Sequence, residues 1–131
     1  MNKLRFCAFV VLLLLDGSRT AFSLPDQQSE PFDTYAQSIS WSSETTRLEN
    51  LAYYLKRFPD HVVFIGFWVG DNDSKKTVKA RATRARRYLI TKLRIDPDRV
   101  RLICSGRLDR SRTTYYVVGE TEPPPEFKEP C

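Results

Sequence analysis

One stretch constrains the fold of this chain more than any other: residues 61–69 read His-Val-Val-Phe-Ile-Gly-Phe-Trp-Val. The stretch is rich in β-branched and aromatic side chains, which favour strands, and it lacks a clean alternation of apolar and polar residues. That pattern is typical of a strand that is buried on both faces. Residues 70–74 then form a cluster of turn-favouring residues. We therefore predict a central strand over residues 61–69.

Two segments with helical spacing flank this strand. Apolar residues recur at intervals of three and four over residues 44–58, where Ser42 or Ser43 is the expected N-cap and Pro59 prevents continuation. A second helix is predicted over residues 77–93, where two alanines in a narrow apolar stripe indicate close approach to a sheet. The stripe residues are Val78, Ala82, Ala85, Leu89 and Leu93.

Two more strands are expected, over residues 99–105 and 113–118, with a turn region at 106–111 between them. In the first of these, Val100, Leu102 and Cys104 would lie on one side. The order of elements predicts an α/β fold (an α+β sandwich): a small mixed sheet with two helices packed on one face, a βαβ crossover and a C-terminal strand. We place this domain at residues 44–119. Residues 24–43 form a polar lead-in compatible with a short edge strand, and residues 120–131 form an acidic, proline-rich tail.

The first 23 residues have the pattern of a secretory signal peptide. Lys3 and Arg5 precede an apolar run over residues 6–15. Ten helical residues reach only about 15 Å, half of a bilayer core, so a membrane-spanning helix is disfavoured. We predict cleavage after Ser23, export to the periplasm or cell envelope, and no transmembrane segment in the mature chain. An uncleaved anchor or a wrongly assigned start codon is the alternative.

The chain has three cysteines, and Cys7 would leave with the signal peptide. Cys104 and Cys131 then remain in an oxidising compartment, where two thiols can pair in a disulfide. The alternative is that Cys104 is a small core residue and Cys131 a free chain end.

Four short motifs follow one another across residues 44–118. They are Leu48–Leu55 followed by Phe58-Pro59, then Val62–Gly66, then Arg81-Ala82 before Tyr88-Leu89, and finally Asp98-Arg99-Val100. In this order and spacing they resemble the OmpA-like C-terminal domain. The resemblance implies a domain without enzymatic activity that binds peptidoglycan non-covalently in the cell envelope.

The resemblance also implies where a ligand would bind. Members of this family hold the diaminopimelate of the peptidoglycan stem peptide between an aspartate at the end of a strand and the arginine of the Arg-Ala pair. Such a ligand carries a carboxylate and an ammonium group, which match a fixed guanidinium and a fixed carboxylate. Arg81 has the arginine position here, but Val69 stands at the aspartate position, so Asp71 and Asp73 are the candidate substitutes. The alternative is that both aspartates only solubilise a loop, in a protein-interaction module of the envelope that has lost peptidoglycan binding.

Charge is unevenly distributed along the chain. Residues 75–112 contain 14 basic and 3 acidic side chains, whereas the rest of the mature chain is acidic. A basic run of this kind can bind nucleic acid. We expect no nucleic-acid partner, because an exported protein rarely meets nucleic acid and no aromatic platform is interleaved with the basic run. We interpret the run as a solvated helix face that the acidic tail partly neutralises.

Enzymatic activity is not expected. The chain has one histidine, His61, and shows neither a nucleophile–base pair nor a glycine-rich phosphate loop before a helix. We therefore predict no catalytic residues, no metal site and no cofactor. The expected partners are the peptidoglycan stem peptide or another envelope protein.

Overall fold

The structure is a computed structural model that describes residues 30–126; the predicted signal peptide and Cys131 lie outside the described residues. The described part forms an α+β fold with two helices and four strands. In chain order these are β1 (Asp33–Ala36), α1 (Trp41–Arg57), β2 (Val62–Gly70), α2 (Lys75–Thr91), a short 3-10 helix (Pro97–Arg99), β3 (Val100–Leu108) and β4 (Arg112–Val118). Both predicted helices and all three predicted strands are present. No helix of the described part is long and apolar enough to cross a membrane.

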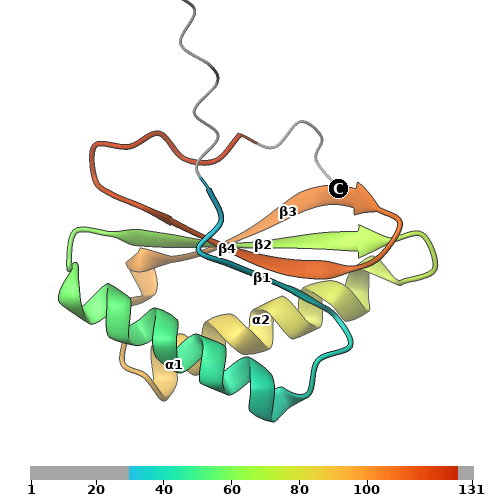
Figure 1. The fold of residues 1–131 in the computed structure, drawn as a ribbon, viewed down its shortest axis with the longest axis horizontal. Helices are drawn as coiled ribbons and strands as arrows, with labels where there is room; N and C mark the ends of the chain where they lie inside the picture. The colour runs from blue at the N-terminus through green and yellow to red at the C-terminus, as the bar shows by residue number, and fades with distance from the viewer. Residues whose placement is uncertain (1–29, 127–131) are drawn as a thin grey trace, which may run out of the picture.

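The strands form one mixed sheet in the order β1-β4-β2-β3. β2 is parallel to β3 and antiparallel to β4, which in turn pairs antiparallel with β1. Figure 1 shows both helices on the same face of the sheet. The predicted two-layer arrangement is therefore confirmed, and so is the β2–α2–β3 crossover between parallel neighbours.

The core lies between the helices and the sheet. Alternate residues of β2 point into it, namely Val63, Ile65, Phe67 and Val69, all at most 2% exposed. The stripe of α2 faces them, and its two alanines are fully buried, as the predicted close approach requires. The other residues of β2 point to the opposite face of the sheet, which neither α1 nor α2 covers (Figure 1).

The N-terminal boundary of the fold differs from the prediction. α1 begins at Trp41, and its N-cap is Ser40, whose Oγ accepts a hydrogen bond from the Ser43 backbone N–H at 3.1 Å. Upstream of it, β1 pairs with β4 and Tyr35 joins the core. The folded part therefore begins about ten residues before the expected boundary at residue 44, because an edge strand from the lead-in completes the sheet.

β3 is also longer than expected. It continues to Leu108 instead of ending at residue 105, although residues 106–111 were predicted as a turn region. Its pairing with β2 shifts register between Phe67 and Trp68 and then continues until Gly70 pairs with Leu108. The irregularity accommodates Gly106 within the strand, which explains why a glycine here does not end it.

Candidate functional site

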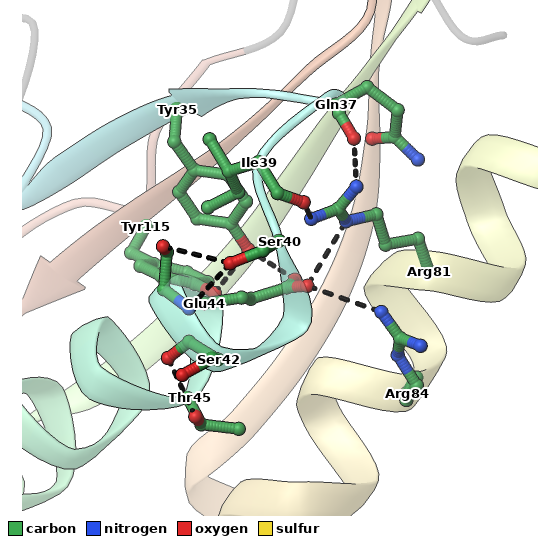
Figure 2. A network of polar contacts seen from close by, with 11 residues as sticks. Tyr35, Gln37, Ile39, Ser40, Ser42, Glu44, Thr45, Arg81, Arg84 and Tyr115 are labelled. Carbon is green, nitrogen blue, oxygen red and sulfur yellow. Dashed lines mark hydrogen bonds and ion pairs between the residues drawn. The ribbon is translucent and has the colours of Figure 1, made fainter.

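The best-defined polar site of the described residues is built around the buried carboxylate of Glu44, in the first turn of α1 (Figure 2). The side chain of Glu44 is 0% exposed. Its Oε1 accepts a hydrogen bond from the Tyr35 hydroxyl of β1 at 2.6 Å, and its Oε2 lies 3.0 Å from Nε of Arg81 on α2. One carboxylate thus joins the edge strand to both helices.

Arg81, the residue predicted to bind a ligand, has its guanidinium turned to this internal carboxylate. Its two terminal nitrogens donate to backbone carbonyls in the loop between β1 and α1. Nη1 donates to the carbonyl of Gln37, and Nη2 donates to that of Ile39 at 2.6 Å. The side chain is 14% exposed. All three nitrogens of the guanidinium are therefore engaged within the protein, and their main structural effect is to hold this loop against α2.

Two tyrosines extend the site into the sheet. The hydroxyl of Tyr115 on β4 lies 2.5 Å from that of Tyr35. Because the Tyr35 hydroxyl donates its hydrogen to Glu44, Tyr115 donates to Tyr35. Burial raises the pKa of both phenols well above the ordinary value, and the nearby Glu44 carboxylate raises the pKa of Tyr35 further. Both tyrosines therefore stay neutral at physiological pH and act as hydrogen-bond donors.

Arg84 forms the solvent-facing side of the site. Its Nη2 lies 3.4 Å from Oε2 of Glu44, and its side chain is half exposed. The guanidinium also stacks over the ring of Trp41, 3.9 Å from the centroid, at the first residue of α1. Such cation–π contacts favour a fixed guanidinium orientation.

Within residues 30–126, no hydrogen bond or ion pair joins either candidate aspartate to Arg81. Oδ2 of Asp73 accepts a hydrogen bond of 2.5 Å from Ser111, whose Oγ also accepts one from the Gly70 backbone N–H. Asp73 therefore ties the β2–α2 turn to the β3–β4 turn. Asp71 is exposed, and the structure records no hydrogen bond or ion pair for its side chain among the described residues.

Several arginines of the basic run have structural roles. Arg86 donates to the carbonyls of Val100 and Pro97, and Arg99 donates to those of Leu55, Phe58 and His61, at the C-terminal end of α1 and the start of β2. Carbonyls at a helix C-terminus lack intrahelical partners, so a guanidinium there satisfies them. The Asp-Arg-Val motif thus contains an arginine that caps a helix.

In the fold, two arginines of the basic run contact aromatic rings that lie outside it in the sequence. The guanidinium of Arg101 lies over the Phe64 ring at 5.6 Å, and that of Arg112 lies over the Trp68 ring at 5.5 Å. Both aromatic residues belong to β2, so strand pairing brings them to arginines that are distant in the sequence. The residue order within the basic run does not indicate these contacts, because they depend on strand pairing.

The remaining candidates are the cysteines. Cys104 is disulfide-bonded. Both other cysteines, Cys7 and Cys131, lie outside the described residues, so the pairing of Cys104 with Cys131 stays a prediction. Within residues 30–126, no group of three or more histidine, cysteine, aspartate or glutamate side chains is placed to hold a metal ion.

Comparison with known proteins gives a structural match without a sequence match. No protein-family model matches the chain, and neither does any curated protein. Among solved structures, the chain is similar to the peptidoglycan-associated lipoprotein from Burkholderia pseudomallei, with a TM-score of 0.50 and 17% sequence identity over 67% of this chain and 87% of that one. This likeness shows the fold. It supports the OmpA-like architecture that the motifs predicted.

Glu44, Tyr35 and Tyr115 were not predicted as parts of a site. A signal for Glu44 is nevertheless present in the sequence. It lies four residues before Leu48 on the apolar stripe that continues through Leu51 and Leu55, so helical periodicity places its carboxylate on the buried face. A buried carboxylate requires a cationic or hydrogen-bonding partner, and only the fold identifies that partner as Arg81.

Proposed function

We propose that the chain is a non-enzymatic, OmpA-like domain of the cell envelope that associates with peptidoglycan. The observation that supports this proposal is its fold, which it shares with a peptidoglycan-associated lipoprotein. The signal-peptide pattern of residues 1–23 supports export, and with it an envelope location. Export is tested by the N-terminal sequence of the protein isolated from the envelope, which we expect to begin at Leu24.

The proposed ligand-binding residues are Arg81, Asp71 and Asp73. Asp71 is the better candidate for an ammonium group, since Ser111 already hydrogen-bonds Asp73. A ligand carboxylate would have to compete with Glu44 for the Arg81 guanidinium. This competition predicts that the ligand binds weakly. The Glu44 carboxylate is held in place by the fold, whereas a free ligand loses translational and rotational entropy when it binds.

The engagement of Arg81 favours a second candidate function, a protein-interaction module of the envelope that no longer binds peptidoglycan. In that case the Glu44–Arg81 pair is purely structural, and the domain uses its scaffold to bind another envelope protein.

Co-sedimentation of the mature protein with purified cell-wall sacculi separates the two. Peptidoglycan binding predicts that the protein pellets with the sacculi, that Asp71→Asn or Arg81→Ala reduces the pelleted fraction, and that Arg87→Ala, a matched change on the exposed side of α2, does not. Because Arg81 also supports the fold, a melting curve must show that the Arg81→Ala variant is folded.

If the unaltered protein stays in the supernatant, peptidoglycan binding is rejected. A third outcome is that added salt abolishes pelleting and that Asp71→Asn and Arg81→Ala pellet as much as the unaltered protein. This outcome would indicate a diffuse electrostatic attraction between the basic run and the sacculi.

A further inference from the structure

The helical layer has an outer side that faces away from the sheet (Figure 1). The apolar stripe of α2 faces the sheet, whereas Lys76, Lys79 and Arg87 of the same helix are exposed. Together with Thr83 they recur at intervals of three and four residues, which places them on one side of the helix, away from the stripe. The row from Lys76 to Arg87 is about 16 Å long.

The fold does not use the three cations of this row. Within residues 30–126 the structure records no ion pair for any of them, and α2 contains no acidic residue. Three other arginines of the same helix contact the Glu44 carboxylate or backbone carbonyls, namely Arg81, Arg84 and Arg86. The outer row of α2 therefore keeps its positive charge available to a partner.

The described part of the acidic tail lies on the other side of the sheet from this row. Glu120 and Glu122 line a shallow cavity together with Phe64 and Arg101, whose side chains belong to the sheet face away from the helices. Figure 1 shows the chain after β4 on that same side. These two carboxylates can therefore offset the charge of Arg101, but they do not lie on the outer side of α2.

α1 adds an exposed aromatic residue and a further cation to the outer side of the layer. Tyr53 is 71% exposed, and Arg57 is exposed one turn later. Each lies two residues from the buried Leu55, so helical geometry turns both to the opposite side of the helix. Of the acidic residues of α1, Glu44 is buried, and the carboxylate of Glu49 accepts a hydrogen bond from α2. We call the set Tyr53, Arg57, Lys76, Lys79 and Arg87 the basic outer face.

The composition of the basic outer face matches an anionic lipid surface. Each lysine or arginine near such a surface gains about fivefold in affinity from the negative headgroups. An exposed tyrosine suits the membrane interface, because its ring enters the apolar boundary while its hydroxyl stays in water. A charged polymer in water also attracts cations, but it offers no apolar layer to Tyr53. The exposed tyrosine therefore favours a membrane over a polymer.

We propose that the basic outer face docks on an anionic lipid surface. Its four cations contact the headgroups, and Tyr53 lies at the boundary between the headgroups and the acyl chains. The apolar stripe of α2 is buried in the domain, so the domain lies on the membrane and does not insert a helix. The inference goes beyond the proposed function and takes from it only the envelope location, where membranes are close to the cell wall.

Flotation of the mature protein with lipid vesicles tests the docking. We expect the protein to float with vesicles that contain phosphatidylglycerol and not with vesicles of phosphatidylcholine alone, and added salt should reduce the floating fraction. Lys76→Ala/Lys79→Ala should weaken binding about 25-fold, at about fivefold for each cation. Arg101→Gln/Arg112→Gln is the matched control, because it removes the same charge from the opposite face of the sheet and should leave binding unchanged. Melting curves confirm that the variants are folded.

A third variant tests whether the partner is a membrane. Tyr53→Ala should lower the floating fraction although the net charge stays the same. Binding to soluble polyphosphate that is tighter than binding to the vesicles, with no effect of Tyr53→Ala on either, would assign the face to a phosphate polymer and overturn the proposal. No flotation with phosphatidylglycerol, or equal losses for the two double variants, would overturn it as well. The vesicles contain no peptidoglycan and purified sacculi contain no lipid headgroups, so this proposal and the proposed function can fail independently.

Discussion

Glu44 illustrates how a single buried charge determines the roles of its neighbours. Removing a carboxylate from water is costly, and partners must offset the cost with several well-placed hydrogen bonds. Here Tyr35 and Arg81 supply them from two elements, and Arg84 adds a longer contact from solvent. The guanidinium of Arg81 is thus required by the fold itself.

Arg81→Ala should therefore destabilise the domain strongly. It leaves Glu44 buried with its closest cationic partner removed, for which a loss of about 3 kcal/mol or more in unfolding free energy is expected. Arg84→Ala should cost much less, because Arg84 is half exposed and lies farther from the carboxylate. Equilibrium urea unfolding measures both. The exposed Arg87→Ala is the matched control and should stay within about 0.5 kcal/mol of the unaltered protein. Equal losses for Arg81→Ala and Arg87→Ala would contradict this account.

The buried tyrosines predict a loss of stability in alkali. The pKa of Tyr35 and that of Tyr115 are raised above 10 in the folded state, mainly by burial. The unfolded chain therefore loses these protons first as the pH rises, so the stabilising contribution is complete below pH 10 and decreases above it.

Unfolding free energies between pH 8 and pH 11.5 test this pH dependence. Tyr115→Phe should flatten the alkaline decrease, because it removes one of the groups whose pKa differs between the two states. Tyr53→Phe is the matched control, since Tyr53 is 71% exposed. The same alkaline slope in Tyr115→Phe and in the unaltered protein would rule out this origin.

At the scale of elements, the contact between β2 and β3 depends on a glycine. A Cβ at Gly66 would lie 2.5 Å from Oγ of Ser105 and 3.2 Å from the ring of Tyr116. Gly66→Ala should therefore lower the unfolding free energy by about 1–3 kcal/mol through overpacking.

A second substitution identifies the clashing atom. Oγ of Ser105 is buried and makes no hydrogen bond among the described residues, so Ser105→Ala should cost little by itself. Combined with Gly66→Ala, it should recover part of the lost stability. Additive effects of the two changes in urea unfolding would show that Ser105 is not the obstacle.

The elements that could be predicted from the sequence are those that local patterns specify. Apolar spacing located both helices and three strands because each element buries its own periodic face. β1 has four residues and depends on pairing with β4, about 80 positions away, so no local pattern indicates it with certainty. The Glu44–Arg81 pair is similarly non-local, because its members are 37 positions apart in the sequence. Arg81 was selected by its place in a motif, but its bonding partner could be found only in the fold.

At the scale of the whole molecule, the arginines of the basic run hold the fold together through specific contacts more than they create a diffuse positive potential. Arg81, Arg86 and Arg99 donate to backbone carbonyls of other segments. The guanidinium groups of Arg101 and Arg112 lie over aromatic rings of β2. Guanidinium groups suit both tasks, because they carry several fixed donors and stack well on rings. The excess of arginine therefore reflects a small two-layer domain that connects its segments through side chains.

A domain of this size gains much stability from a covalent link, and the predicted pairing of Cys104 with Cys131 allows the gain to be calculated. A disulfide between Cys104 and Cys131 closes a loop of roughly 30 residues, for which the chain-entropy model gives about 3.5 kcal/mol of unfolding free energy at 25 °C. Urea unfolding with and without dithiothreitol should show a loss of this order on reduction. The double variant Cys104→Ser/Cys131→Ser should match the reduced protein and be indifferent to the reductant. If reduction leaves the unfolding midpoint unchanged, the bond does not restrain the unfolded chain, and Cys104 is not joined to Cys131 as predicted.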